Sequence, residues 1–122
     1  MSRDVLKLSI AAKPEYISAV RMFISAVAAR LDFTLAKIED IRTAVSEGCT
    51  LAMRSMPERV DIEVRAEASL EVEIIAEGSS APADSDADEF SMMLIEAMAD
   101  EIETMRSGEA LCGFKMRFDA RS

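Results

Sequence analysis

The chain has 122 residues and a formal net charge of −9, from 23 acids against 14 bases, and it contains no histidine. The acidic balance argues against binding to a nucleic-acid backbone, and the lack of histidine removes the usual general base and His-based zinc sites. Half of the residues are hydrophobic and only seven are Gly or Pro (four and three), so we expect one compact domain over residues 1–122.

Composition also bears on the compartment. No apolar run approaches the roughly 20 residues that a membrane helix needs. The first residues, Met1 to Asp4, lack the basic and apolar regions of a signal peptide, so we expect a cytoplasmic protein with no membrane partner. Cys49 and Cys112 fall in a helix pattern and a strand pattern without Cys-x-x-Cys spacing, which favours two buried thiols over a redox site.

The first half of the chain predicts one strand and two helices. Residues 5–10 alternate as a strand with one apolar face. Pro14 suits the first turn of a helix whose apolar stripe ends at Leu31. Thr34 is a good N-cap for a second helix, which should end by Ser55 because a proline follows.

The second half predicts a hairpin, a helix and a last strand. Residues 60–65 and 70–74 alternate and are joined by a short connection, which is typical of an antiparallel hairpin. Residues 79–88 are predicted to be a loop, and residues 112–118 a final strand. Apolar residues at helical spacing predict a third helix that ends near Gly108; they are Phe90, Leu94, Met98, Ile102 and Met105.

The resulting order is β-α-α-β-β-α-β. Each strand offers one apolar face, and three amphipathic helices need a surface to cover. A single sheet with all helices on one side satisfies both demands. We therefore predict an α+β fold: a two-layer α/β sandwich with a mainly antiparallel four-stranded sheet covered on one face by three helices.

Two segments carry a family resemblance. Residues 43–51 read TAVSEGCTL inside the second predicted helix, and residues 74–80 read IIAEGSS at the end of a predicted strand. In this order and context they resemble the first two nucleotide-site boxes of the anti-sigma-factor serine kinases, part of the GHKL ATPase superfamily shared with histidine kinases, gyrase and Hsp90. The resemblance covers nearly the whole chain and implies the histidine-kinase-like (Bergerat) ATPase fold.

The boxes depart from the family pattern. The family's first box is Glu-x-x-x-Asn, in which Glu is the general base and Asn holds Mg²⁺; here the positions are Glu47 and Leu51. Its second box is Asp-x-Gly-x-Gly, here Ala76, Gly78 and Ser80. Leu51 has no oxygen for Mg²⁺, and Ala76 has no side-chain acceptor for the adenine amino group. Gly78 suits a close ligand approach or a plain turn equally well.

Two further positions differ. Where the family has a Gly-rich stretch before its third helix, residues 79–89 are acidic and would repel a triphosphate. Gly113-Phe114 stands where the family often has Gly-Thr. We therefore expect no cofactor. We expect ATP and Mg²⁺ to bind only if the chain is an active kinase, in which case Glu47 would be the base and Gly78 and Gly113 would shape the pocket. No residue is expected to bind a metal otherwise.

Three functional interpretations stay open. The first is an anti-sigma-like regulator that acts by protein–protein binding, sequestering a sigma factor or a STAS-type antagonist in partner switching, with ATP binding lost or weak. The second is an active ATP-dependent serine protein kinase that phosphorylates such an antagonist. The third keeps the pocket for an apolar or non-nucleotide ligand.

The resemblance also implies a possible homodimer through the first strand and first helix. Because Phe23 lies off the main apolar stripe of its helix, it is the best single candidate for an exposed anchor. Core burial is the competing role for most of the candidate interface residues, which are Leu6, Leu8, Tyr16, Val20 and Phe23.

Overall fold

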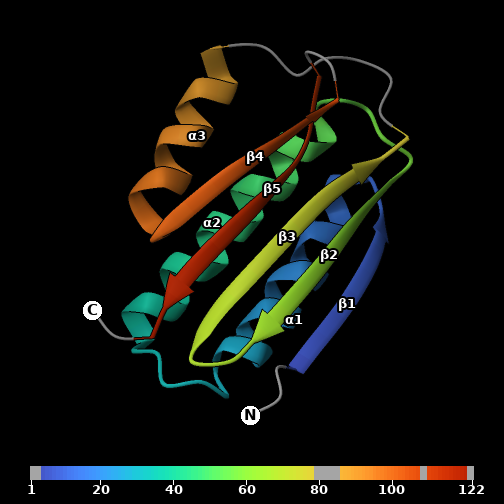
Figure 1. Cartoon of the computed structure of the whole chain (residues 1–122). Helices are drawn as coiled ribbons and strands as arrows, with labels where there is room; N and C mark the ends of the chain where they lie inside the picture. Colours follow the sequence, from blue (N-terminus) through green and yellow to red (C-terminus); the bar gives the residue numbers. More distant parts are fainter. Residues whose placement is uncertain (1–3, 79–85, 108–109, 121–122) are drawn as a thin grey trace.

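A computed structural model describes residues 4–78, 86–107 and 110–120 (Figure 1). A short 3₁₀ turn, η1, precedes the first of three α-helices. The elements in chain order are β1 (Asp4–Ala11), η1 (Pro14–Tyr16), α1 (Ile17–Ala28), α2 (Leu35–Met53), β2 (Arg59–Ala66), β3 (Ser69–Glu77), α3 (Asp86–Met98), β4 (Glu101–Ser107) and β5 (Ala110–Asp119).

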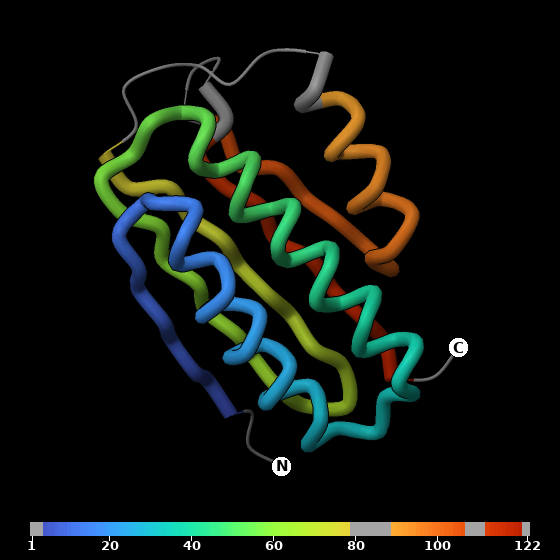
Figure 2. The backbone as a smooth tube through the Cα atoms, turned by 180° about the vertical axis from the view of Figure 1, so that it is seen from behind, coloured from blue at the N-terminus to red at the C-terminus, as the bar shows by residue number. Residues whose placement is uncertain are grey.

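The strands form one antiparallel sheet in the order β1-β2-β3-β5-β4. Figure 2, seen from the helical side, shows α1 and α2 lying across one face, with α3 continuing this layer beside α2. Within the described residues, no helix lies on the opposite face of the sheet (Figure 1). The prediction of a two-layer α+β sandwich is therefore confirmed.

The predicted strand number was wrong, because the sheet has five strands and not four. The third helix ends at Met98, and Glu101–Ser107 forms β4, which pairs with β5 at the sheet edge. Ile102 and Met105 fit a helical spacing, but Ile102 pairs with Met116 across the β4–β5 ladder. The helix also begins earlier than expected, at Asp86, while the rest of the predicted loop, residues 79–85, lies outside the described chain.

The inner face of α3 also differs from the prediction. Phe90, expected inside, is 62% exposed, and Ile95 is fully buried instead. Ser91, one turn earlier, is also buried. The helix is thus rotated by about one position relative to the predicted stripe, because it packs mainly against α2 and not over the sheet centre.

Local signals position α2, the helix that carries the first predicted box. Thr34 has an extended backbone and its hydroxyl accepts a hydrogen bond from the Lys37 amide at 3.1 Å, so the N-cap prediction is confirmed. The helix ends at Met53, before Ser55 as expected. A Cβ atom on Gly48 would lie 2.7 Å from side-chain atoms of Ile74 and Met116, so a glycine here lets α2 approach β3 and β5 closely.

Candidate functional site

The first predicted box lies in the last half of α2. Glu47 is half-buried, whereas Leu51, one turn later on the same helical face, is fully buried. Leu51 belongs to the hydrophobic core that joins the helices to the sheet. The position that the resemblance assigns to a magnesium ligand is therefore occupied by packed hydrocarbon.

The second box lies at the end of β3. Ala76 is 6% exposed and stands opposite Val60 of β2 in the strand register. Gly78 follows the strand with a φ of +79°, a left-handed conformation that favours glycine. The Glu58 amide donates to the Glu77 carbonyl at 2.8 Å, which closes the end of this hairpin. Gly78 thus has a sufficient structural reason in the backbone turn itself.

The third position lies on β5. Phe114 is fully buried and pairs with Ile74 of β3 on one side and Thr104 of β4 on the other. The preceding Gly113 is also buried, and a Cβ atom there would lie 2.6 Å from the Ile74 carbonyl oxygen. A neighbouring strand, and not an open cavity, therefore fills the space beside Gly113.

The structure brings three of the predicted site residues into one hydrophobic core: Leu51, Ala76 and Phe114. Glu47 lies one turn from Leu51 and supplies a carboxylate at the edge of that core. Ser80 lies outside the described residues. At the described box positions the side chains offer no second oxygen beside Glu47, so they do not fit a Mg²⁺–nucleotide complex. Within the described ranges no group of three metal-binding side chains occurs.

The two cysteines differ in burial. Cys49 is fully buried in α2, and burial raises the pKa of its thiol to about 12. Cys112 is half-buried, and its Sγ donates to the Met105 carbonyl at 3.3 Å across the β4–β5 pair. The prediction of a buried thiol is confirmed for Cys49 and was wrong for Cys112, which lies near the sheet edge.

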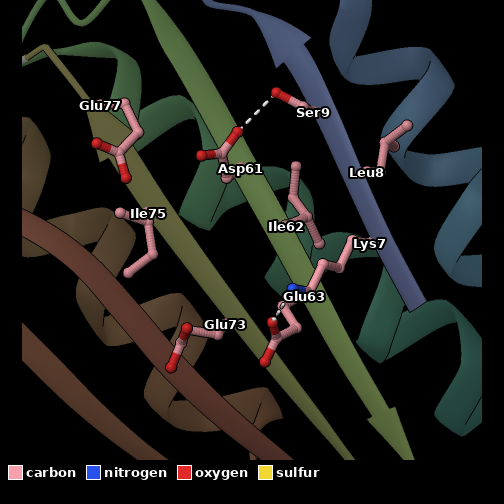
Figure 3. A pocket seen from close by; sticks show the side chains of 9 residues that line it. All are labelled: Lys7, Leu8, Ser9, Asp61, Ile62, Glu63, Glu73, Ile75 and Glu77. Carbon is pink, nitrogen blue, oxygen red and sulfur yellow. Dashed lines mark hydrogen bonds and ion pairs between the residues drawn. The ribbon is translucent and has the colours of Figure 1, made fainter. Parts of the chain in front are cut away.

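A hollow of about 400 Å³ lies on the open face of the sheet (Figure 3). Four of its nine lining residues are acidic, and Ile75 contributes an apolar side chain. Two of the acids are already engaged: the Ser9 hydroxyl donates to Asp61 at 2.6 Å, and Lys7 pairs with Glu63 at 3.5 Å. The open face therefore carries charged side chains in contact with solvent, as expected for an antiparallel sheet with one solvated face.

The helical layer has a second hollow, between α1 and α2, which no sequence pattern predicted. It is lined by Ser18, Arg21, Met22, Ser25 and Arg42. The first four recur at three- and four-residue spacing, so they share one face of α1 that differs from its buried stripe. That spacing was visible in the sequence, but the partner, Arg42 on α2, is set by how the two helices pack.

The predicted interface residues have mixed outcomes. Val20 is fully buried, and Phe23, Leu6 and Leu8 are partly buried against the core, so Phe23 is not an exposed anchor. Tyr16 is 42% exposed. The prominent apolar side chain of this surface is instead Met22, which is 74% exposed.

Comparison with known proteins defines the class. Residues 10–113 match the model of the histidine kinase-like ATPase domain, which covers most of the chain. The chain belongs to this family. The fold agrees with the family, since three helices cover one face of an antiparallel sheet.

Curated relatives are similar over a shorter stretch. The chain is similar to the serine-protein kinase RsbW of Bacillus pumilus, with 43% identity over 51 residues, 42% of this chain and 32% of the relative. It is 45% identical over 53 residues (43% and 33%) to RsbW of Bacillus velezensis, and 41% identical over 51 residues (42% and 32%) to that of Bacillus subtilis. These alignments span about a third of the relatives' length. Among the described helices, none is long and apolar enough to cross a membrane.

Proposed function

We propose that the chain is an anti-sigma-like regulator that acts by binding other proteins, with ATP binding lost or weak. The observation that carries this proposal is the burial of Leu51 and Ala76, both within the core. A polar ligand at these positions would need either an oxygen that neither side chain has or the opening of packed hydrocarbon. Either change would cost free energy, and a family member with polar side chains at these positions would not have that cost.

The partners of this proposal follow from the resemblance to the RsbW group: a sigma factor, a STAS-type antagonist, or both in alternation. A homodimer and a cytoplasmic location belong to the same proposal. The surfaces that support protein contact are the exposed Met22 and Tyr16 on the α1 side of the molecule. Direct nucleic-acid binding has no role in it, because the net charge is −9.

The second candidate function is an active serine protein kinase. It is favoured by the half-exposed Glu47, which keeps the family's general-base position, and by the relatives named serine-protein kinases. Under this function the carboxylate of Glu47 would accept the proton of the hydroxyl being phosphorylated. The remaining nucleotide contacts would have to come from backbone groups or from residues outside the two boxes.

A nucleotide titration distinguishes the protein-binding function from the kinase function. The purified chain is titrated with Mg-ATP and Mg-ADP by calorimetry and by thermal unfolding, with RsbW of Bacillus subtilis as a positive control. We expect no saturable heat and no shift in Tm at millimolar nucleotide. A ligand at 100 times its Kd stabilises a protein by about 2.7 kcal/mol, which corresponds to several degrees in Tm for a domain of this size. A shift of that size at micromolar ATP would favour the kinase function instead.

A further inference from the structure

The third helix leaves large apolar side chains in solvent while it buries a serine. Phe90 is 62% exposed and Met93 is 66% exposed, whereas Ser91 is only 5% exposed and Ile95 is fully buried. A helix that covers a core normally turns its apolar stripe inward and its polar residues outward. The packing of α3 that the structure describes is therefore not the one that its sequence pattern favours.

The exposed apolar residues of α3 form a stripe of their own. Phe90, Met93, Leu94 and Ala97 follow one another at the spacing i, i+3, i+4 and i+7, which places them on one face of the helix. Leu94 is half-buried, and the other three are exposed. The helix thus has two apolar faces, one against the core around Ile95 and one beside it in solvent.

The rotation of α3 about its axis depends mainly on its contact with one other helix. Figure 2 shows α3 beside α2, at the end of the helical layer, and α2 is its main neighbour. The polar contacts that fix the chain in this region come after the helix. The Asp100 amide donates to the Arg117 carbonyl at 2.9 Å, and the Asp100 carboxylate lies 3.0 Å from Lys37 Nζ. These contacts fix the turn after α3 and leave the helix itself to apolar packing.

A slip of one residue along α2 would exchange the two faces. An α-helix advances by about 1.5 Å and turns by about 100° per residue, so a one-residue slip puts each side chain in the place of its neighbour. Leu94 would then take the place of Ile95, which conserves volume. Phe90 would take the place of Ser91, so that an aromatic ring is buried, at the cost of the extra room that it needs. These two effects oppose each other, which keeps the two packings close in free energy.

We propose that α3 is a conformational switch with a second packing on α2, slipped by one residue. In this slipped packing Phe90, Leu94 and Ala97 are buried and Ile95 is exposed. The switch changes the apolar surface that α3 presents to solvent, which is centred on Phe90 in the described packing and on Ile95 in the slipped one. The occupant of the core is the same helix in both states, so the inference rests on the packing of α3 and not on the proposed function.

Fluorine NMR of the full chain tests the switch. The five phenylalanines are labelled with fluorine, and the Phe90 signal is assigned by its loss in Phe90→Leu. Relaxation dispersion detects exchange between packings on the microsecond-to-millisecond timescale of helix register shifts. A soluble, neutral gadolinium chelate broadens the signals of exposed rings. We expect the Phe90 signal to exchange between an exposed major state and a protected minor state populated to about 1% or more.

Two matched variants shift the balance in opposite directions, and each adds one carboxylate to α3. Ile95→Glu places a charge in a site that is buried in the described packing, so α3 should slip and the broadening of Phe90 should fall at least about threefold. Ala97→Glu places the charge in a site that is buried only in the slipped packing. Phe90 should then stay as exposed as in the native protein, and its exchange should disappear. Circular dichroism should show unchanged helix content in both variants.

Three results would overturn the switch. The first is a Phe90 ring that is as exposed or more exposed in Ile95→Glu, since greater exposure means that α3 has unfolded and not slipped. The second is exchange of Phe90 that survives in Ala97→Glu, and the third is the absence of exchange in the native protein. If Ile95→Glu does not fold, the comparison of the native protein with Ala97→Glu decides. The nucleotide titration is independent of all these outcomes, so the switch and the proposed function fail separately.

Discussion

A Cβ atom placed on Gly113 would lie 2.6 Å from the carbonyl oxygen of Ile74, on the neighbouring strand β3. Real Cβ atoms do not approach a backbone oxygen so closely, so the two strands can pair at this register only with glycine in β5. The resemblance assigned Gly113 to a nucleotide pocket. Its contact with Ile74 gives it a role in the sheet itself.

Gly113→Ala should therefore destabilise the fold, whether or not a nucleotide binds. We expect the free energy of unfolding to fall by about 1–3 kcal/mol, the usual cost of overpacking. Chemical denaturation measures it. Gly78→Ala is the comparison: its φ is +79°, but its new Cβ would meet the Glu58 side chain at 3.1 Å. We expect a smaller loss there, about 1 kcal/mol. A stable Gly113→Ala protein would show that the strand contact does not explain the glycine.

Leu51 offers a second test, since a core residue and a pocket residue respond differently to truncation. Leu51→Ala removes a fully buried side chain and should cost about 2–5 kcal/mol. Leu35→Ala, in the same helix at a side chain that is 83% exposed, should change stability by less than about 0.5 kcal/mol. Thermal and urea unfolding of the two variants are compared. If Leu51→Ala and Leu35→Ala had the same free energy of unfolding, the packing of Leu51 in the core would be contradicted.

The sequence predicted most of the fold because alternation and helical spacing are local signals. Val60, Ile62 and Val64 of β2 are all buried, as the period of two requires. The strand β4 could not be predicted in this way. Ile102 lies four residues after Met98 and therefore continues a helical stripe, while its pairing with β5 is a contact that spacing does not reveal.

The candidate site was predicted only in part, because sequence motifs are local signals and helix packing is not. Leu51 and Ala76 were identified by their positions in two motifs, and their burial follows from their residue types. The hollow between the helices was missed because it depends on Arg42 of α2 facing Ser25 of α1. No pattern within either helix specifies that contact; it depends on the packing of α1 on α2.

Asp100 gives the fold a defined acid sensitivity. The Asp119 amide donates to the Asp100 carboxylate at 2.8 Å and Lys37 Nζ lies 3.0 Å from it, and these contacts, the amide first, lower the pKa of Asp100 below its usual value. Because the pKa of Asp100 is lower in the folded than in the unfolded protein, its ionised carboxylate stabilises the fold, and this contribution is fully present above the unfolded pKa of about 4. It is lost as the pH falls through the folded pKa.

Asp100→Asn should remove part of that acid sensitivity. We expect the variant to be less stable at pH 7, by about 0.5–1.5 kcal/mol because solvent screens the pair, and the difference should shrink as the pH falls below about 4. Urea unfolding at several pH values measures it. Lys37→Gln should give a smaller change, because the Asp119 amide remains. A difference that grows toward low pH would contradict the assignment.

Met56 has a φ of +53°, although it is not glycine, and its side chain is 70% exposed. A left-handed backbone costs a non-glycine residue about 1–2 kcal/mol, so Met56→Gly should raise stability by about 0.5–1 kcal/mol after the added freedom of the unfolded chain is counted. Met22→Gly is the matched control: the same exposed residue type in the middle of α1 should lose about 1 kcal/mol. The two variants are thus expected to change the Tm in opposite directions.

Cys49 provides a reagent test of the core beneath α2. Burial raises the pKa of its thiol to about 12, so almost no thiolate is present at pH 8, and only the thiolate reacts with iodoacetamide. We expect mass spectrometry to find Cys112 alkylated first, since it is half-buried, and Cys49 unmodified until the protein unfolds. Leu51→Ala lowers the stability of the whole fold, so the protein should open more often and Cys49 should react faster at an unchanged pH. Rapid modification of Cys49 in the native protein would mean that this end of α2 opens readily. The burial of the first-box positions would then be only transient.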